Sequence, residues 1–389
     1  MLTAETTALL EATRALGPHI RAQIAQMEAD RRLPPELAQA MAEIGIFRVM
    51  IPKSLGGLEM DLIPALHLFE TVAQIDGSAG WCAMIGATGG TTSAFLTDEV
   101  AREIYGNNPN VITAGAIAPN GKAQPIAGGY RVTGRWPFNS GCQHSQWLMG
   151  TSVIFENGEP RKLPNGYPET RMMIFPASDA EILDTWSVSG LRGSGSHDIA
   201  VQDVFVPEER AVAYGSGTRY QSGPLYTFPI FGLLAVSVAS VATGMARGAI
   251  DTFIELAKTK HLTGSRRLIN QRSVVQLQVA QAEALLRAGR AFMFETVQEV
   301  WDTVVAGEKT TQHDKALIRL SACHATTASA QAIDLMYQAA GTGAIWDSSP
   351  IQRHFRDVHM ITQHAVVASP ISEVAGKVLL GLKPEFPML

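Results

Sequence analysis

A chain of 389 residues, with 46% apolar and 17% charged residues, is long enough for two or three packed units and too apolar for a disordered protein. The formal net charge is −5 and the Lys and Arg residues are scattered, which gives no reason to expect a nucleic acid partner. The three cysteines, Cys82, Cys142 and Cys323, lie far apart, so the sequence predicts neither a metal site nor a disulfide scaffold.

The ends and the most apolar stretch give no sign of a membrane. The first residues lack the basic and apolar segments of a signal peptide, and the apolar stretch 228–241 is too short and too rich in serine and glycine to span a bilayer. We therefore expect a cytoplasmic protein without a membrane anchor.

The first hundred residues show the periodicity of amphipathic helices. Apolar side chains predict one helix over residues 3–30 and another that begins at Pro34-Pro35, where the missing N–H groups cost nothing. Residues 61–76 predict a third helix. The next helix is expected to begin with Ser78 as its cap, and the glycines inside it suggest close packing or a ligand against the backbone.

From residue 111 the pattern changes to that of strands. The expected strands are 111–117, 130–138, 147–154, 171–175, 182–188 and 199–206. About one hundred residues of closely spaced strands between two helical blocks predict a small barrel or sandwich within a helical framework.

Long helices are expected in the last part of the chain. They cover residues 228–262, 272–306, 310–340 and 350–380, the last broken by Pro370. The sequence therefore predicts an α+β protein with three domains. These are an N-terminal helical domain at 1–110, a middle β-domain at 111–215 and a C-terminal four-helix bundle at 216–389.

One polar stretch interrupts the strand pattern. After Trp136-Pro-Phe138, the seven residues from Asn139 to Ser145 are small or hydrogen-bonding and stand between two apolar strands. Such a run at a strand end presents a hydroxyl, an imidazole and backbone N–H groups to a ligand. A plain hairpin loop fits the same pattern.

This strand resembles the flavin-contacting strand of the acyl-CoA dehydrogenase superfamily. Its Trp-x-Phe-x-Ser-Gly-x-x-His form resembles the oxygenase component of two-component flavin monooxygenases, a branch of that superfamily. Three further motifs stand in family order, at 52–57, at 190–196 with 203–207, and at 338–343 with Arg356-Asp357. The resemblance covers nearly the whole chain and implies the acyl-CoA dehydrogenase fold, with the C-terminal bundle building a homotetramer.

The resemblance also implies an activity, that of a flavin-dependent monooxygenase. A separate flavin reductase would supply reduced FMN or FAD, and oxygen would be transferred to a small organic substrate, with aromatic compounds among the candidates. The family's arginine motif for the FAD pyrophosphate is absent, which leaves FMN and FAD both open. Two alternatives remain: an acyl-CoA dehydrogenase with FAD, and a non-catalytic flavin-binding protein.

The residues that would hold the flavin follow from the same resemblance. Trp136, Phe138 and Ser140 would lie beside the ring, with Ser140 near N5. The loop 190–196 would offer Arg192 and Ser194 as a nest for phosphate oxygens or the pyrimidine edge, although a tight strand connection explains the loop as well. Arg266 is a candidate phosphate contact. The turn of Gly341, Thr342 and Gly343 would approach a flavin, often across a subunit boundary.

Catalytic and substrate residues complete the expected site. Where acyl-CoA dehydrogenases carry their catalytic glutamate, this chain has Gln363-His364, and no carboxylate occurs between Asp357 and Glu373. Because imidazole works as an acid or base near neutral pH, His364 is predicted to be catalytic together with Ser140. The residues expected to contact the substrate are Trp81, Thr88 and His144. Thr88 stands where aromatic-hydroxylating relatives often place a histidine, which argues against a phenol.

Overall fold

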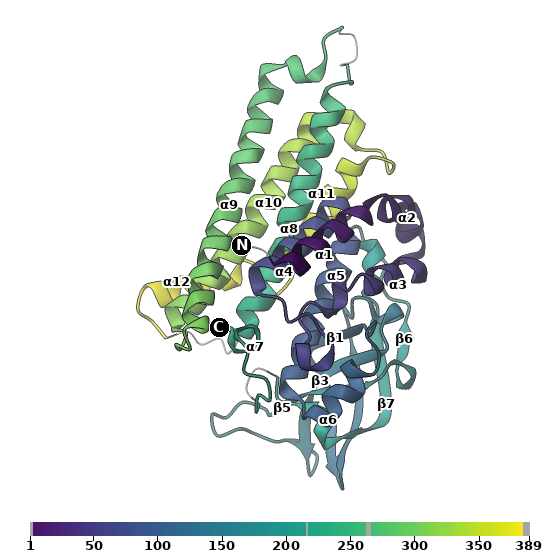
Figure 1. The fold of residues 1–389 in the computed structure, drawn as a ribbon, viewed down its shortest axis with the longest axis vertical. Helices are drawn as coiled ribbons and strands as arrows, with labels where there is room; N and C mark the ends of the chain where they lie inside the picture. Colours follow the sequence, from purple (N-terminus) through teal and green to yellow (C-terminus); the bar gives the residue numbers. More distant parts are fainter. Residues whose placement is uncertain (1–2, 215–216, 262–265, 384–389) are drawn as a thin grey trace.

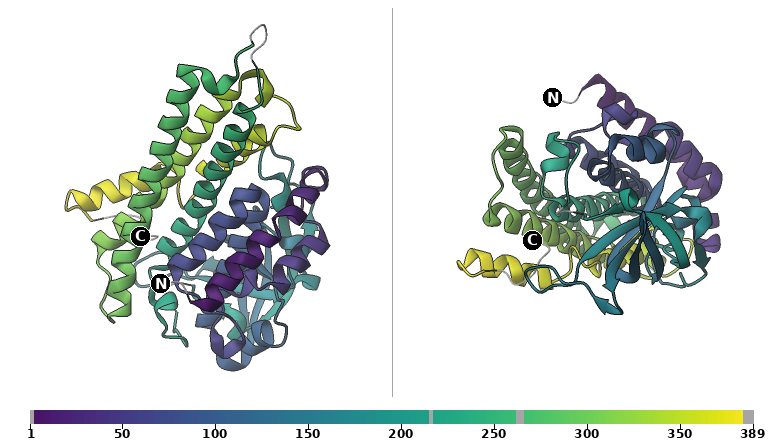
Figure 2. Two further views of the ribbon diagram at one scale, coloured as in Figure 1. Left: turned by 45° about the horizontal axis from the view of Figure 1, so that its top comes forward. Right: turned by 90° about the horizontal axis from the view of Figure 1, so that it is seen from below.

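The computed structural model describes residues 3–214, 217–261 and 266–383. Figure 1 shows the N-terminal helices lying against the base of a bundle of long helices, with the sheet below them and the bundle rising away from it. Figure 2 shows the same arrangement from two other directions. The α+β fold with helical, sheet and helical parts in that order is confirmed. The predicted boundary between the middle and C-terminal domains, 215–216, lies outside the described residues.

The N-terminal part contains six α-helices among the described residues. They are α1 (Ala4–Ala15), α2 (Gly17–Asp30), α3 (Pro35–Glu43), α4 (Leu62–Ile75), α5 (Gly77–Gly89) and α6 (Asp98–Ala101), joined by the short turns η1 (Ile46–Arg48), η2 (Lys53–Leu55), η3 (Gly90–Phe95) and η4 (Arg102–Gly106). The single helix expected over residues 3–30 is two helices. Pro18 stands in the first turn of α2, where it begins a new helix more readily than it continues an old one.

The start of α5 corrects the expected cap. Asp76, not Ser78, has the extended backbone of an N-cap, and its Oδ1 accepts the N–H of Ala79 at 3.0 Å. Ser78 is buried in the first turn of the helix. Both residue types cap helices well, so sequence alone favoured neither strongly.

The middle part forms one mixed sheet. Its strands are β1 (Thr113–Ile126), β2 (Gly129–Trp136), β3 (Trp147–Glu156), β4 (Glu159–Pro160), β5 (Thr170–Pro176), β6 (Glu181–Leu183), β7 (Asp198–Pro207) and β8 (Ala211–Val212). The order is β6-β7-β2-β1-β3-β5-β8, with β4 on β3, and only the β1–β3 pair is parallel among the described strands. Strand β1 is longer than expected, and residues 184–188 of the expected fifth strand, 182–188, leave the sheet.

Trp136 fills the centre of the sheet's own core. Its side chain is fully buried, its Nε1 donates to the carbonyl of Thr151 at 2.7 Å, and its ring packs against Phe175. Three glycines make room for the indole, because a Cβ at any of them would lie within 2.6 Å of it: Gly121, Gly134 and Gly150. This enclosure corrects the expectation that Trp136 contacts the cofactor, because no surface of its ring is left for a ligand.

The C-terminal part is built from long helices. They are α8 (Ile230–Ala257), α9 (Ser273–Val305), α10 (Gln312–Ala340) and α11 (Pro350–Thr362), preceded by α7 (Pro224–Thr227) and followed by α12 (Pro370–Leu379). The expected break at Pro370 is confirmed, since α12 begins there. Helix α8 is long and apolar enough to cross a membrane, but 78% of its most apolar window is buried, as in the central helix of a bundle.

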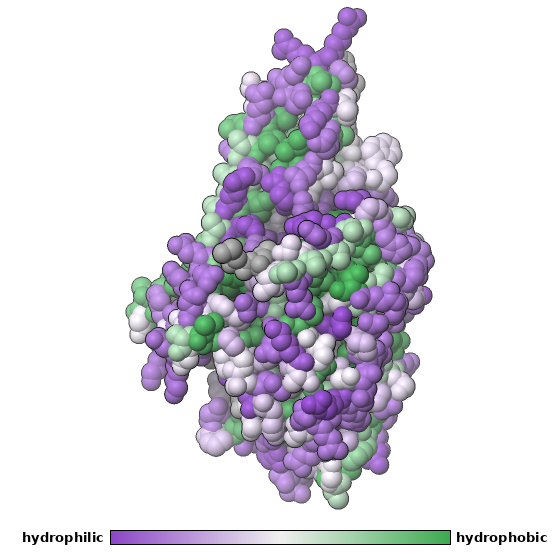
Figure 3. All heavy atoms as spheres, viewed as in Figure 1, coloured by the Kyte–Doolittle hydropathy of each residue, from purple (hydrophilic) through white to green (hydrophobic). Residues whose placement is uncertain are grey.

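Polar groups fasten the N-terminal helices to the bundle. Glu70 on α4 accepts two hydrogen bonds from Arg290 on α9, at 2.8 and 2.9 Å, and one from Thr243 on α8. Burial alone would raise the pKa of Glu70, but hydrogen bonds from His67, Arg290 and Thr243 hold it below its usual value. Glu70 is therefore charged at neutral pH and ties three helices together. Figure 3 shows polar and apolar side chains mixed over the face of the molecule that is seen in Figure 1.

Candidate active site

Three distant parts of the chain meet at the indole of Trp81. Its Nε1 donates a hydrogen bond to the hydroxyl of Ser140 at 2.9 Å. Its ring lies edge-on to that of His364, with 5.3 Å between the centroids. Helix α5, the turn after β2 and the segment after α11 thus bring Trp81, Ser140 and His364 together. We call these three residues the central cluster.

A chain of serine hydroxyls leads away from the central cluster. The Oγ atoms of Ser140 and Ser196 lie 2.7 Å apart, as do those of Ser196 and Ser194. Ser194 Oγ in turn donates to the carbonyl of Leu191 at 2.7 Å. All three serines are at most 4% exposed, so water does not compete for these hydroxyls. We call Ser140, Ser196 and Ser194 the serine chain.

The loop 190–196 owes its shape to two left-handed residues. Leu191 has φ +50° and Gly195 has φ +54°, which folds the loop so that Ser194 and Ser196 turn toward β2. The N–H of Gly141 donates to the carbonyl of Ser194 at 3.0 Å, which ties the loop to the turn after β2. Left-handed backbone at a leucine is uncommon, and the surrounding contacts must hold it in place.

Asp357 on α11 is one of these contacts. Its Oδ1 accepts the N–H of Leu191 at 2.6 Å, whereas its Oδ2 is buried without a hydrogen-bond partner in the described part of the chain. Burial, reinforced by the nearby Asp76, raises the pKa of Asp357 to about 7. Asp357 therefore faces the loop and acts on its backbone, not on the central cluster.

His364 is half-buried and neutral. Burial, with the nearby Arg319 charge, lowers its pKa to about 4. The N–H of Val366 points at Nδ1 at 3.4 Å, which favours the tautomer that carries its proton on Nε2. No hydrogen bond within the described residues engages Nε2. His364 thus presents an N–H donor beside Trp81.

Phe138 offers a surface that fits a planar ring. Its side chain is 69% exposed, and its backbone is left-handed with φ +62°. The ring of Trp186 stands perpendicular to that of Phe138, with 6.2 Å between the centroids. An exposed aromatic face on strained backbone, two residues from Ser140, is a feature that a bound ligand would explain. That a flavin ring lies against Phe138, with Ser140 at its polar edge, stays a prediction.

In the loop 190–196, the side chains of Arg192 and Ser194 bond to other parts of the chain. Arg192 turns away from Ser140: its Nε donates to the carbonyl of Glu28 at 3.0 Å, and the Glu28 carboxylate also pairs with Arg356 at 2.9 Å. The hydroxyl of Ser194 donates to the carbonyl of Leu191. These contacts fit a tight strand connection, and direct cofactor contacts from Arg192 and Ser194 stay predictions.

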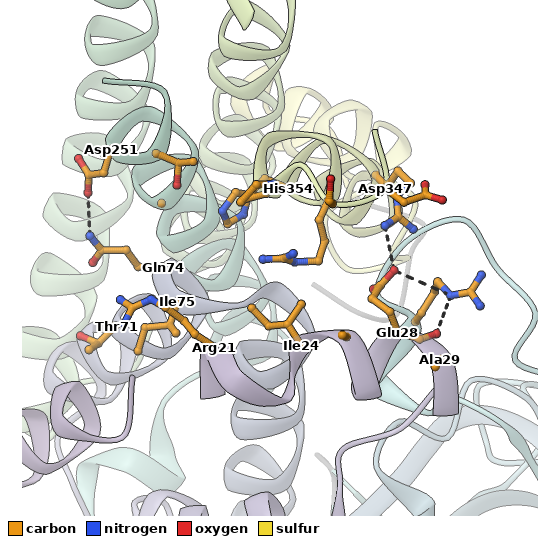
Figure 4. Close-up of a pocket in the computed structure, with 18 of the residues that line it drawn as sticks. Arg21, Ile24, Glu28, Ala29, Thr71, Gln74, Ile75, Asp251, Asp347 and His354 are labelled. Atoms are coloured by element: carbon orange, nitrogen blue, oxygen red, sulfur yellow. Dashed lines mark hydrogen bonds and ion pairs between the residues drawn. The ribbon is translucent and has the colours of Figure 1, made fainter. Parts of the chain in front are cut away.

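The same arginines border a large cleft, about 1170 Å³ in volume, between α2, α4, α8 and α11. Figure 4 shows Glu28 between its arginine partners and His354 pointing into this cleft, with Gln74 and Asp251 bonded on the far side. The residues that line it do not include the central cluster. A large cleft is often a binding site, but here the aromatic and hydroxyl groups that suit flavin chemistry lie elsewhere.

The remaining substrate candidates are less well placed than Trp81. The hydroxyl of Thr88 donates to the carbonyl of Met84, four residues earlier in α5, at 2.9 Å. The ring of His144 packs against Phe47, 6.4 Å between centroids, and burial lowers its pKa to about 4. Contacts from Thr88 and His144 to a substrate stay predictions.

Arg266 and the turn of Gly341, Thr342 and Gly343 lie at the other end of the molecule. Lys260, at the end of α8, donates to the carbonyl of Ala340, so the α8–α9 connection and this turn adjoin each other. Figure 1 shows this end of the bundle opposite the sheet. Within one chain these residues therefore do not join Ser140.

Sequence reasoning missed the groups that hold Ser140 in place. Ser196 and the carbonyl of Leu191 stood inside a recognised motif, but periodicity says nothing about which side chains a loop turns inward. Asp357 also belonged to a recognised motif. Its signal was a carboxylate next to apolar positions of a helix that is otherwise buried on that side.

Comparison with known proteins agrees with this arrangement. The family model described as "Acyl-CoA dehydrogenase, N-terminal domain" matches residues 3–105, and "Acyl-CoA dehydrogenase, C-terminal domain" matches residues 236–369. The indole-3-acetate monooxygenase of Pseudomonas putida is 32% identical, over 95% of this chain and 92% of its own. The oxygenase subunit HsaA, a flavin-dependent monooxygenase of Mycobacterium tuberculosis, is 29% identical over 93% and 92%.

A solved structure extends the agreement to three dimensions. XiaF from Streptomyces, in complex with FADH2 and glycerol, superposes with a TM-score of 0.92 at 25% identity, covering 99% of this chain and 98% of its own. The expected fold, enzyme class and reduced-flavin cofactor are thus confirmed. The chain belongs to the acyl-CoA dehydrogenase superfamily, in the branch of flavin-dependent monooxygenases.

Proposed function

We propose that this chain is the oxygenase component of a two-component system that oxygenates an aromatic substrate. A separate reductase supplies reduced FMN or FAD, and the bound flavin activates molecular oxygen. The observation that carries the proposal is the central cluster, in which a hydroxyl and a neutral imidazole both contact one indole. The three free, buried cysteines support a cytoplasmic location.

Each member of the cluster has a task. Ser140 would contact the N5 edge of the flavin, and the exposed face of Phe138 would support its ring. The indole of Trp81 gives an aromatic substrate an edge or face to pack against. The substrates named for the curated relatives, indole-3-acetate among them, are aromatic and suit such a wall.

The tautomer of His364 separates the two roles that imidazole can have here. With Nδ1 turned toward the N–H of Val366, a further proton would have to displace that contact, so His364 is a poor base. Its Nε2–H is available as a donor. We therefore assign His364 to donate a hydrogen bond to a substrate oxygen or to the activated oxygen, rather than to remove a proton.

We also propose that the site is completed by another subunit of a homotetramer. Phe138 is exposed in the single chain, whereas the α8–α9 connection and the turn after α10 lie at the end of the bundle opposite the sheet. If these groups contact a flavin, it is that of a neighbouring subunit. Such sharing encloses the flavin, which favours oxygen transfer over release of peroxide to water.

The test supplies reduced FMN or reduced FAD, ¹⁸O₂ and a panel of aromatic acids, indoles and phenols, and measures label in the products by mass spectrometry. We expect one ¹⁸O atom in the product from at least one member of the panel. Anaerobic reduction of bound FAD by an acyl-CoA would contradict the proposal and favour a dehydrogenase. Flavin binding with no turnover of either kind would favour the non-catalytic alternative.

A further inference from the structure

Counting the protons of the serine chain shows which hydroxyl donates and which accepts in each of its hydrogen bonds. Each serine hydroxyl carries one proton and can donate one hydrogen bond. The chain contains three contacts that need a donor: Ser194 to Leu191, Ser196 to Ser194, and Ser140 to Ser196. Within the described residues, the three hydroxyls have no other partner except the indole N–H that reaches Ser140.

The carbonyl at the end fixes every donor along the chain. Leu191 O can only accept, so Ser194 gives its proton to it. Ser194 then has no proton for Ser196, and Ser196 must donate to Ser194. By the same count Ser140 must donate to Ser196. All three protons therefore point away from the central cluster.

Ser140 is left as an acceptor. Its proton is engaged by Ser196, and one of its lone pairs receives the Nε1–H of Trp81, a group that only donates. The remaining lone pair is the part of Ser140 that a ligand can meet. A ligand with an N–H at this point gains a hydrogen bond, whereas a ligand with a bare nitrogen meets lone pair against lone pair.

We propose that the serine chain makes the protein select the redox state of its flavin, with Ser194 and Ser196 as positioning residues that orient Ser140. The proposal rests on the proposed function, which places flavin N5 at Ser140. Reduced flavin carries a proton on N5 and suits the acceptor. Oxidised flavin has a bare N5 and does not. An oxygenase that receives reduced flavin from a reductase must bind it in preference to the oxidised flavin in the same cell.

Oxidised flavin can be accommodated only if every hydrogen bond along the serine chain reverses its direction. Ser140 would then donate to N5, Ser196 to Ser140 and Ser194 to Ser196. Leu191 O would lose the hydroxyl of Ser194 and keep the indole N–H of Trp186 and the backbone N–H of Ser194, each at 3.0 Å. Reversal thus gives up one buried hydrogen bond. Because a hydrogen bond of ordinary strength corresponds to about a three- to tenfold change in an equilibrium, the selection should have that size.

The backbone of the loop 190–196 keeps the hydroxyls of the serine chain at fixed positions. Gly141 N–H donates to Ser194 O, and Asn139 N–H donates to His197 O at 2.9 Å, so both ends of the chain sit on one hydrogen-bonded frame. The Cβ of a residue in place of Gly190 would lie 2.4 Å from the carbonyl of Arg356, which seats the loop against α11. The oxygen atoms are therefore held at 2.7 Å spacings whether or not a ligand is bound.

The experiment measures the dissociation constants of oxidised and reduced flavin, the latter anaerobically, for wild type, Ser196→Ala and Ser194→Ala. Wild type should bind reduced flavin more tightly. Ser196→Ala releases the proton of Ser140 and should lower the ratio of the oxidised to the reduced constant by about three- to tenfold. Ser194→Ala removes the hydroxyl that donates to Leu191 O, so the serine hydroxyls can reverse without losing a hydrogen bond, and it should lower the ratio by a similar factor.

Ser329→Ala is the matched control. Ser329 is also fully buried, but its hydroxyl donates within α10, to the carbonyl of Ala325 at 2.7 Å. In Ser329→Ala, the ratio of the dissociation constants of oxidised and reduced flavin should equal that of wild type. A purely structural role for Ser194 and Ser196 would weaken both redox forms alike and leave the ratio unchanged, which would overturn the proposal, as would a wild-type preference for oxidised flavin.

The outcomes also distinguish a failure of the redox selection from a failure of the proposed oxygenase function. Wild type that oxygenates a substrate but shows the same ratio as both serine variants defeats the inference alone. Wild type that binds neither form of flavin defeats both. Thermal melting of each variant shows that a changed ratio comes from a folded protein.

Discussion

Ser140 and His364 contact the same indole, but one presents a hydrogen-bond acceptor and the other a hydrogen-bond donor. Ser140 presents a lone pair, because its proton is engaged by Ser196, and His364 presents an N–H, because its Nδ1 faces the backbone. An acceptor and a donor that both adjoin Trp81 can distinguish a flavin edge from a substrate or oxygen atom. This division of roles leads to different expectations for the two residues.

Replacing Ser140 with alanine should separate flavin binding from oxygen transfer. One hydrogen bond to the flavin edge is lost, about 0.5–1.5 kcal/mol, so reduced flavin should still bind. Product formed per flavin oxidised should fall, and hydrogen peroxide should rise in its place. A Ser140→Ala enzyme with unchanged coupling would show that Ser140 does not contact the reactive edge.

His364 can be tested with two amides that imitate its two nitrogens. Asparagine places an amide near the position of Nδ1, and glutamine places one near Nε2. If Nε2–H is the working donor, His364→Asn should reduce the oxygenation rate by about 10²-fold, and His364→Gln should recover part of it. Glutamine cannot take up a proton, so a base at this position would leave both variants equally inactive.

The pH profile gives an independent check on His364. Burial lowers its pKa to about 4, so the imidazole is neutral throughout the range from pH 6 to 8. The rate in wild type should therefore show no step near pH 6.5 that disappears in His364→Gln. A step of that kind would mean that His364 titrates at its ordinary value and works as a base.

Individual residues were predictable where their chemistry is local. Ser140 and His364 were found because a family motif marked them, and Trp81 because it follows a helix start rich in glycine. The indole of Trp136 belonged to the same motif, yet it is enclosed by three glycines from three strands. No periodicity in one strand shows which of its aromatic residues faces the sheet core and which faces a ligand.

Helix α11 connects the bundle to the serine chain through Asp357. The carboxyl bonds the N–H of Leu191, the residue whose carbonyl ends the chain. Folding raises the pKa of Asp357 to about 7, above its unfolded value of about 3.9. Stability linked to this group is therefore greatest below the unfolded pKa and declines as pH rises toward the folded pKa.

Asp357→Asn should remove this pH dependence. The amide is neutral at every pH and can still accept the N–H of Leu191 through its oxygen. The variant and wild type should have similar unfolding free energies near pH 4, and by pH 8 the variant should be the more stable, by at most about 4 kcal/mol. Chemical denaturation at both values measures the difference. A variant less stable than wild type at pH 8 would indicate that the ionised carboxylate is needed.

The junction of α4 with α9 has the opposite dependence. Glu70 has a lowered pKa, so its stabilising pairs are present above the unfolded pKa and are lost as pH falls through the folded one. Arg290→Met leaves Glu70 charged and short of two hydrogen bonds, and should destabilise the protein by about 2 kcal/mol at pH 7. The deficit should shrink as pH falls below 4. Arg287→Met, on the same helix at a pair that is mostly exposed, should change the stability little.

Elements were predictable where their periodicity is long and uninterrupted. The long helices α9 and α10 agree with the expected ranges to within a few residues. The division of α1 from α2 and the length of β1 were not foreseen, because a single proline and a polar strand surface both leave the pattern ambiguous. Short loops that carry left-handed residues, such as 190–196, are beyond pattern reasoning altogether.

The complete molecule raises the question of what covers the outer surfaces. Large apolar side chains are exposed on α9, after α10 and directly after α12, among them Leu277, Trp346 and Leu380. Such side chains, at several places on one bundle, are typical of a surface that packs against further copies of the chain. We expect a tetramer in sedimentation at micromolar concentration, and a monomer there would contradict both the assembly and the shared site.

Mixing two inactive variants tests whether the site is shared. Arg266 stands at the end of the bundle that lies opposite the sheet holding Ser140, so each site would take Ser140 from one subunit and Arg266 from its neighbour. Ser140→Ala and Arg266→Ala should each lose coupled oxygenation when assembled alone. After joint unfolding and refolding in equal amounts, about a quarter of the sites should contain both native residues, since each is supplied with even odds. Recovery to about a quarter of wild-type coupling is therefore expected. Coupling that stays at the level of the separate variants would place both residues at the site of one chain, or remove Arg266 from the site.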